Sequence, residues 1–328
     1  MATYTIIKLT HLTPLHIGTG KENYDFSASD LQSDTLTAAL AAIRAQMGKD
    51  GDIKEFLDSF VLSSAFPFKK DIFFLPKIQG KINVIVRNQQ EQEYRKKLKK
   101  IKYIDSSVWQ KLINGEQVQI DKEQLNDEFI WGKNETCKSV YKSQVNQRVS
   151  VPRMDNQDAE PFYFDWKFFN DDAGLYCITD ASGELLKEIT SLFTILGNSG
   201  LGTDRSIGGG KFQVETNSIS ITSPKDSDAI ILLSLYIPNE EEISSLNLKE
   251  SKYNILLRGG FISGSQEVEL RHLRKKSIYM FDKGSVFKTI KPLIGKTVDL
   301  KPQWNDEKMH SVYRSGRPFY LPIKSNEL

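Results

Sequence analysis

The chain has 328 residues, of which 39% are hydrophobic, and its 44 Lys and Arg against 42 Asp and Glu give a formal net charge of +2. This length predicts two domains, and the near balance of charge excludes a protein that coats nucleic acid by bulk charge, although a local basic groove remains compatible with it. The two cysteines form no CxxC pair, and no 18-residue apolar run or signal-like segment occurs, so we expect a cytoplasmic chain without metal, cofactor or membrane partner.

The first 77 residues predict a strand, helices and a second strand. Residues 4–12 alternate between apolar and polar side chains, which is typical of a strand, and residues 71–77 predict another. Between them, residues 36–47 place apolar side chains on one helical face. We interpret Asp34, together with Ser33, as the cap of this helix rather than as a catalytic carboxylate.

The next part of the chain is polar. Residues 89–115 are predicted to be largely helical, and residues 95–102 contain six Lys or Arg. This basic run fits a solvated helix face and a surface for an RNA backbone equally well. Residues 126–158 have little periodicity and are interpreted as an insertion or long loop, which carries Arg148 and Arg153.

The regular pattern then resumes. Strands are predicted at 162–169, 174–179 and 211–221, and an amphipathic helix at 183–196. With an insertion at about 80–160 set aside, residues 1–222 fit the order β-α-β-β-α-β, the ferredoxin-like plan that RNA-recognition modules also use. The sequence thus predicts an α+β domain here.

A second domain is expected at residues 223–328. It follows the linker-like stretch Ser-Pro-Lys-Asp-Ser-Asp, which begins at Ser223. Strands are predicted at 229–237, 254–264, 277–281 and 312–323. Their order is too irregular to derive a complete second ferredoxin-like unit from the pattern alone.

A glycine-rich loop is the most informative feature of the sequence. Six of the fourteen residues from Gly197 to Gly210 are glycine, and Arg205, Ser206 and Lys211 lie among or beside them. Such a backbone approaches ligands closely and can direct N–H groups at an anion. The loop lacks the spacing of a nucleotide P-loop and of a dinucleotide fingerprint. We therefore expect it to bind RNA phosphates rather than a nucleotide cofactor.

Several blocks resemble the RAMP superfamily of CRISPR effector proteins along nearly the whole chain. They include His-Ile-Gly-Thr-Gly from His16, Ser-Ala-Phe-Pro-Phe from Ser64, the glycine-rich loop from Gly200, and Tyr-Arg-Ser-Gly-Arg-Pro-Phe-Tyr from Tyr313. The glycine-rich loop alone indicates only the superfamily, whereas the Ser-Ala-Phe-Pro-Phe block and the C-terminal block resemble most closely the subunit of type III-A Csm complexes that caps the 5′ end of the crRNA.

This resemblance implies two packed ferredoxin-like domains and binding of the crRNA 5′ handle. It also implies contacts to the large polymerase-cyclase subunit and to the first backbone RAMP subunit, an RNA-kinking hairpin within 126–158, and no cleavage activity. The RNA-binding candidates are His16, Gly18, Gly20, Ser33, Arg148, Arg153, Gly200, Gly202, Arg205, Ser206, Gly208, Gly209, Gly210, Lys211 and Arg258.

Two alternatives stay open at this point. The chain could be a metal-independent RAMP endoribonuclease that processes crRNA precursors with His16 as general base, because a histidine beside a phosphate-binding loop can activate a 2′-hydroxyl. It could also be the handle-binding subunit of a different type III complex.

Overall fold

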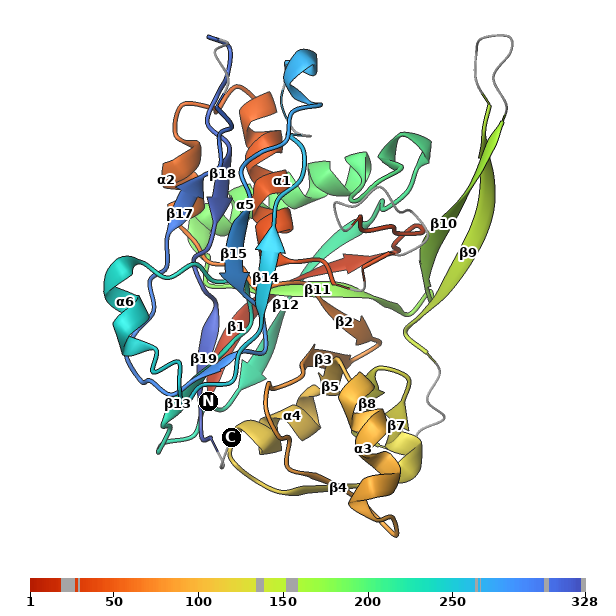
Figure 1. The fold of residues 1–328 in the computed structure, drawn as a ribbon, viewed down its shortest axis with the longest axis vertical. Helices are drawn as coiled ribbons and strands as arrows, with labels where there is room; N and C mark the ends of the chain where they lie inside the picture. The colour runs from red at the N-terminus through yellow and green to blue at the C-terminus, as the bar shows by residue number, and fades with distance from the viewer. Residues whose placement is uncertain are drawn as a thin grey trace.

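The structure, a computed structural model, describes residues 1–18, 27–28, 30–133, 139–151, 159–262, 265, 267–303 and 307–325. It is a mixed α+β protein built around an eight-stranded sheet with the order β12-β1-β11-β2-β3-β5-β8-β7 (Figure 1). Among these residues no helix is both long enough and apolar enough to cross a membrane.

Four antiparallel strands form one half of the sheet, with β12 at its edge: β1 (Ala2–Thr10), β2 (Phe66–Lys69), β11 (Ala173–Thr179) and β12 (Gln213–Ile221). β1 lies between β11 and β12, so that Ile7 is opposite both Cys177 and Thr216. Its alternation places Ile7 and Leu9 on one face, where they are buried with α1 (Ser33–Gln46), α2 (Ile53–Asp58) and α5 (Gly183–Ser199). The strands predicted at 4–12, 174–179 and 211–221 and the helices predicted at 36–47 and 183–196 are confirmed, with ends that differ by at most three residues, whereas β2 was not predicted.

The start of α1 differs from the prediction. Gln32 is the N-cap, and its side chain makes no capping hydrogen bond. Ser33 and Asp34 are the first two residues of the helix and are buried, with 4% and 0% of their surface exposed. The interpretation of both residues as caps is therefore wrong: their side chains serve contacts with the C-terminal half of the chain, described below.

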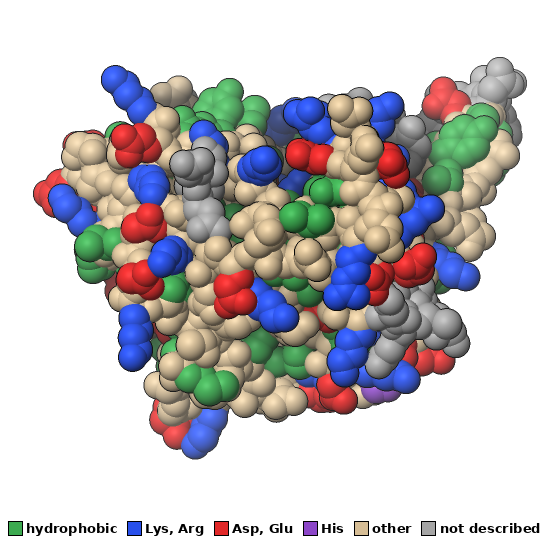
Figure 2. Space-filling model, turned by 90° about the horizontal axis from the view of Figure 1, so that it is seen from below, with side chains coloured by type: hydrophobic (Ala, Val, Ile, Leu, Met, Phe, Trp, Pro, Cys, Tyr) green, Lys and Arg blue, Asp and Glu red, His purple; other side chains and the backbone are tan. Residues whose placement is uncertain are grey.

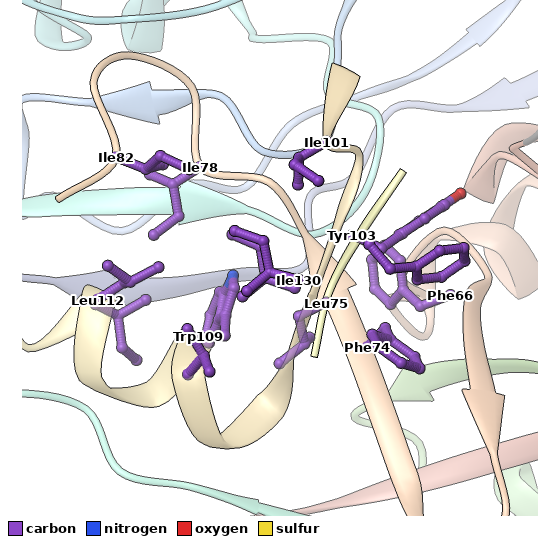
Figure 3. Close-up of a cluster of buried hydrophobic side chains, with 14 of the residues drawn as sticks. Phe66, Phe74, Leu75, Ile78, Ile82, Ile101, Tyr103, Trp109, Leu112 and Ile130 are labelled. Carbon is purple, nitrogen blue, oxygen red and sulfur yellow. The ribbon is translucent and has the colours of Figure 1, made fainter. Parts of the chain in front are cut away.

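Residues 72–130 extend the sheet and form a small subdomain, seen at the bottom of Figure 1. Its elements are β3 (Ile72–Pro76), β4 (Val84–Val86), α3 (Glu91–Lys100), β5 (Tyr103–Asp105), α4 (Ser106–Ile113), β6 (Val118–Ile120), η1 (Lys122–Gln124), β7 (Leu125–Asn126) and β8 (Phe129–Ile130). Trp109 of α4 is fully buried in its core (Figure 3), and the indole N–H donates to the Pro76 carbonyl over 3.0 Å.

Two long strands, β9 (Tyr141–Ser150) and β10 (Glu160–Phe169), form an antiparallel hairpin that projects from the body of the protein (Figure 1). β10 confirms the strand predicted at 162–169. The expectation of a long irregular loop over 126–158 is wrong for β9, because this strand lies within it. Most side chains of β9 are solvent-exposed, so its sequence lacks the alternation that a half-buried strand requires.

The C-terminal half packs on the sheet through three strands, β13 (Ala229–Leu232), β16 (Val286–Phe287) and β19 (Tyr320–Ile323). Ile231 and Phe319 share one buried cluster with Ile6 of β1, so the two halves have a common core. The remaining elements are α6 (Glu240–Ser245), β14 (Ile255–Arg258), η3 (Val268–Leu270), β15 (Ile278–Phe281), β17 (Thr297–Asp299) and β18 (Tyr313–Ser315). The strand predicted at 312–323 is thus two strands, β18 and β19.

Candidate nucleic-acid interface

The glycine-rich loop packs against the segment that follows β1. The Gly210 N–H donates to the Pro14 carbonyl over 2.9 Å, and the Thr203 N–H donates to the His16 carbonyl over 3.1 Å. Gly202 has a φ of +83°, and a Cβ there would lie 2.2 Å from the His16 carbonyl oxygen. Glycine is required at this position by both the backbone conformation and the close approach.

The N–H groups of the triple glycine are used inside the protein. Gly208 donates to the Arg205 carbonyl over 3.1 Å, Gly209 to the Asp204 carbonyl over 3.2 Å, and Gly210 to Pro14. The expectation that these groups point at a phosphate is therefore not met. Instead, the loop projects the exposed side chains of Arg205 and Ser206 from η2 (Arg205–Ile207), and Lys211 is exposed at its end.

Arg148 of the hairpin reaches the same loop. Its guanidinium forms a salt bridge with Asp204 and lies 4.3 Å from the Phe164 ring centroid and 5.4 Å from that of Trp166. Trp166 also lies against Gly209, where a Cβ would come within 2.8 Å of the indole. Ion pairing and cation–π contact thus join the hairpin to the loop. Residues predicted from distant parts of the sequence do lie together here.

His16 lies beneath this junction, with only 1% of its surface exposed. Its Nδ1 is 2.7 Å from the Asp165 carbonyl oxygen, so Nδ1 donates, and its ring centroid is 4.3 Å from that of Phe164. The prediction that its side chain lines an open groove is wrong, since the side chain is buried against Phe164 and Asp165 of β10. A buried ring also cannot reach a 2′-hydroxyl, which argues against a general base here. Gly18 is exposed, whereas Gly20 and Arg153 lie outside the described residues.

Ser33 does not face the RNA-binding candidates. Its hydroxyl accepts a hydrogen bond from the Leu235 N–H over 2.9 Å, and its own N–H donates to the Ser64 hydroxyl over 3.1 Å. The prediction of an RNA contact at Ser33 is wrong because the side chain is buried between the two halves of the chain.

Arg258 is also directed inward. Its Nε and Nη2 donate to the two carboxylate oxygens of Asp34, each over 2.9 Å, and Nη2 also donates to the Thr35 hydroxyl over 2.9 Å. About a quarter of the side chain (26%) is exposed. The side chain therefore binds an internal carboxylate first, and only its outer edge is left for a ligand.

Sequence reasoning missed the partners of Asp34. Arg314 of β18, 5% exposed, forms a second salt bridge with this carboxylate. Burial alone would raise the pKa of Asp34, but Arg314 and Arg258 outweigh it and hold the pKa below its usual range. The Arg-Ser-Gly-Arg block at 314–317 was visible in the sequence, but nothing local links it to a residue 280 positions earlier.

The basic run lies on α3 of the subdomain. Tyr94 and Leu98 hold the helix to the subdomain core, and Arg95 and Lys99 are among its exposed cations. Figure 2 shows the underside of the molecule, where Lys and Arg side chains are interspersed with Asp and Glu. The structure shows that most cations of the run are exposed, which fits both the solvated helix face and the RNA-backbone surface.

The sequence of this chain is similar to those of known CRISPR proteins. Residues 225–323 match the family model Csm4_C, described as the CRISPR Csm4 C-terminal domain. A relative from Streptococcus thermophilus, "CRISPR system Cms protein Csm4", is 26% identical over 321 residues, which cover 94% of this chain and 95% of the relative. The protein of the same name from Thermococcus onnurineus is 25% identical over 271 residues, covering 78% and 83%.

Solved structures share the fold over its whole length. A chain from a Csm1-Csm4 cassette in complex with cA4 aligns with a TM-score of 0.63 and 18% identity, covering 99% of this chain and 100% of the other. A chain from the Csm3-Csm4 subcomplex of the type III-A CRISPR-Cas interference complex gives 0.62 and 16%, covering 98% and 100%. The chain is thus similar in sequence to Csm4 proteins along nearly its whole length, its residues 225–323 match the Csm4 C-terminal domain, and the solved structures share its fold.

Proposed function

We propose that this protein is a non-catalytic subunit of a type III-A CRISPR interference complex. It holds the 5′ handle of the crRNA and links the large polymerase-cyclase subunit to the first backbone RAMP subunit. Its similarity to Csm4 proteins along nearly the whole chain carries this proposal. Chains of the same fold occur in a Csm1-Csm4 cassette and in a Csm3-Csm4 subcomplex, which supports one partner of each kind.

The strand order also supports a finer description of the fold. β12-β1-β11-β2, with α1 and α5 in the connections, has the strand order 4-1-3-2 of a β-α-β-β-α-β unit. We infer a ferredoxin-like domain at residues 1–222, into which the subdomain and hairpin are inserted, and a second one at 223–328. The family match at 225–323 is consistent with this boundary.

The handle would bind where the loop and hairpin meet. Arg205 and Lys211 are exposed and form no salt bridge with a described residue, so their charge is available to phosphates. Arg148 is held beside them by Asp204. Phosphate contacts of this kind give affinity that falls with salt. The β9–β10 hairpin projects beside this site, where it could bend the RNA strand.

The test measures binding of handle RNA by the purified protein at several salt concentrations. Arg205→Ala with Lys211→Ala should weaken binding and reduce the slope of log K against log salt by about 1.4, because each phosphate contact with a single strand contributes about 0.7. The matched control is Arg95→Ala with Lys99→Ala, which removes the same two charge types from α3. Equal losses in both variants would contradict a specific site at the loop.

RNA cleavage is tested with the same purified protein. Incubation of the protein with repeat RNA in EDTA should leave the RNA intact. Specific cleavage that His16→Ala abolishes would overturn the non-catalytic assignment and establish the endoribonuclease alternative.

A further inference from the structure

A second cluster of cations lies in the C-terminal half, in the segment between η3 and β15. It reads Arg-His-Leu-Arg-Lys-Lys from Arg271 to Lys276. Arg271, Arg274 and Lys276 are exposed, Lys275 is half-buried, and none of the four forms a salt bridge with a described residue. The segment therefore presents positive charge that nearby carboxylates do not neutralise.

An aromatic side chain, Phe261, packs against one of these cations. Phe261 is 45% exposed, and the Arg274 guanidinium lies over its ring at 5.0 Å from the centroid. The two residues also pair through a backbone bridge, which fixes the stack. A guanidinium stacked on a ring offers a flat outer face, and unpaired bases stack on such faces.

The inner side of the cluster has a surplus of positive charge. Lys275 lies near Asp34, Arg258 and Arg314, so three cations surround one carboxylate. Burial, together with repulsion from Arg314 and Arg258, lowers the pKa of Lys275 to about 8. Keeping this ammonium charged therefore costs folding free energy, which an anion bound beside it would offset.

The place of the cluster suits the same RNA strand. The segment around η3 stands at the upper end of the molecule in Figure 1, the end at which the β9–β10 hairpin also projects. Stacking faces flanked by lysines fit a single strand, whose bases are free, better than a duplex or an acidic peptide, which offer no unstacked ring.

We propose that Phe261, Arg274, Lys275 and Lys276 form a second contact for single-stranded RNA. The ring–guanidinium stack takes one base, and the two lysines take the adjacent phosphates. This proposal rests on the proposed function and adds a site to it, outside the glycine-rich loop.

The test measures the affinity of the full chain for handle RNA in variants of the stack. Phe261→Ala should weaken binding roughly 10- to 100-fold without changing the salt dependence, because stacking is not ionic. Phe261→Tyr keeps the ring and should bind like the unchanged protein. Val268→Ser, at a position 70% exposed in the same segment, controls for general effects on the segment. Equal RNA affinity of Phe261→Ala and Phe261→Tyr would contradict the proposal that a base stacks at this position.

The lysines have a separate readout. Lys275→Ala with Lys276→Ala should lower the salt slope by about 1.4, and poly-glutamate of matched charge should compete poorly with RNA. Strong competition by poly-glutamate would instead identify an acidic protein partner and overturn the proposal.

The two proposals fail in distinguishable ways. If the unchanged protein binds no handle RNA, the proposed function fails. If Arg205→Ala with Lys211→Ala weakens binding while the Phe261 and lysine variants do not, only the second contact fails.

Discussion

Asp34→Asn removes the carboxylate that Arg258 and Arg314 share at the contact between the two halves of the chain. The asparagine has nearly the same shape, so the change is mainly one of charge. It leaves two guanidinium groups, one of them 5% exposed, without their counterion. The nearby Lys275 adds a third positive charge.

The expected cost is large. Removing one partner of a buried ion pair destabilises a protein by about 3–5 kcal/mol. With an unfolding entropy of about 2.1 cal/mol/K per residue, this loss lowers the midpoint of thermal unfolding by about 4–7 °C in a chain of this length. Because the pKa of Asp34 is lowered on folding, the carboxylate stabilises the protein above about pH 4, and this contribution disappears as the pH falls further.

Thermal unfolding followed by circular dichroism at pH 7 and at about pH 3 measures both effects. The matched control is Asp52→Asn, which also removes an arginine partner, but whose side chain is 56% exposed and pairs with Arg44. Exposed pairs contribute little, so the control should shift the midpoint only slightly. A decrease for Asp34→Asn no larger than that of the control would refute the assignment of Asp34 as the buried link between the halves.

Three further predictions concern the loop and the cation clusters. Gly202→Ala should disrupt the loop and weaken RNA binding, because its Cβ would lie 2.2 Å from the His16 carbonyl oxygen. Gly208→Ala has a similar φ of +91° but places its Cβ in open space, so its effect on RNA binding should be much smaller. Equal effects of the two substitutions would contradict the packing argument. Lys275→Met should stabilise the free protein at pH 7 by about 3 kcal/mol and weaken RNA binding. The stability of the unchanged protein should rise between about pH 8 and pH 10.5, because the unfolded state holds this proton longer, and the variant should lack that rise. Arg148→Lys should retain charge but lose the planar contact with Phe164, so hydrogen exchange at the hairpin should increase; unchanged exchange would argue against that coupling.

The sequence predicted elements with one buried face well. β1 and α5 carry periodic apolar positions that pack on the core, and both lie where periodicity placed them. β9 was missed because it is a solvent-exposed strand. β4 and β6 were missed because they are only three residues long and pair in parallel with each other. A strand with one buried face has apolar residues at regular intervals in the sequence, whereas a very short or solvent-exposed strand has no such regular pattern.

The candidate site was predicted only in part. Local composition identified the glycine-rich loop and its cations, and the salt bridge between Arg148 and Asp204 joins a predicted arginine of the hairpin to this loop. It could not separate exposed polar residues from buried ones, so His16 and Ser33 were assigned to the RNA surface. Their burial depends on Asp165 and Leu235, which are 149 and 202 positions away in the sequence.

The central claim is that the loop cations hold the crRNA within the assembled complex. The most direct measurement is the amount of crRNA that co-purifies with the complex when this subunit carries Arg205→Ala and Lys211→Ala, compared with Arg95→Ala and Lys99→Ala. The account predicts a loss of crRNA for the loop variant at moderate salt, with a normal content for the control and no change in the unfolding temperature of either purified subunit. Full crRNA content in the loop variant would contradict it.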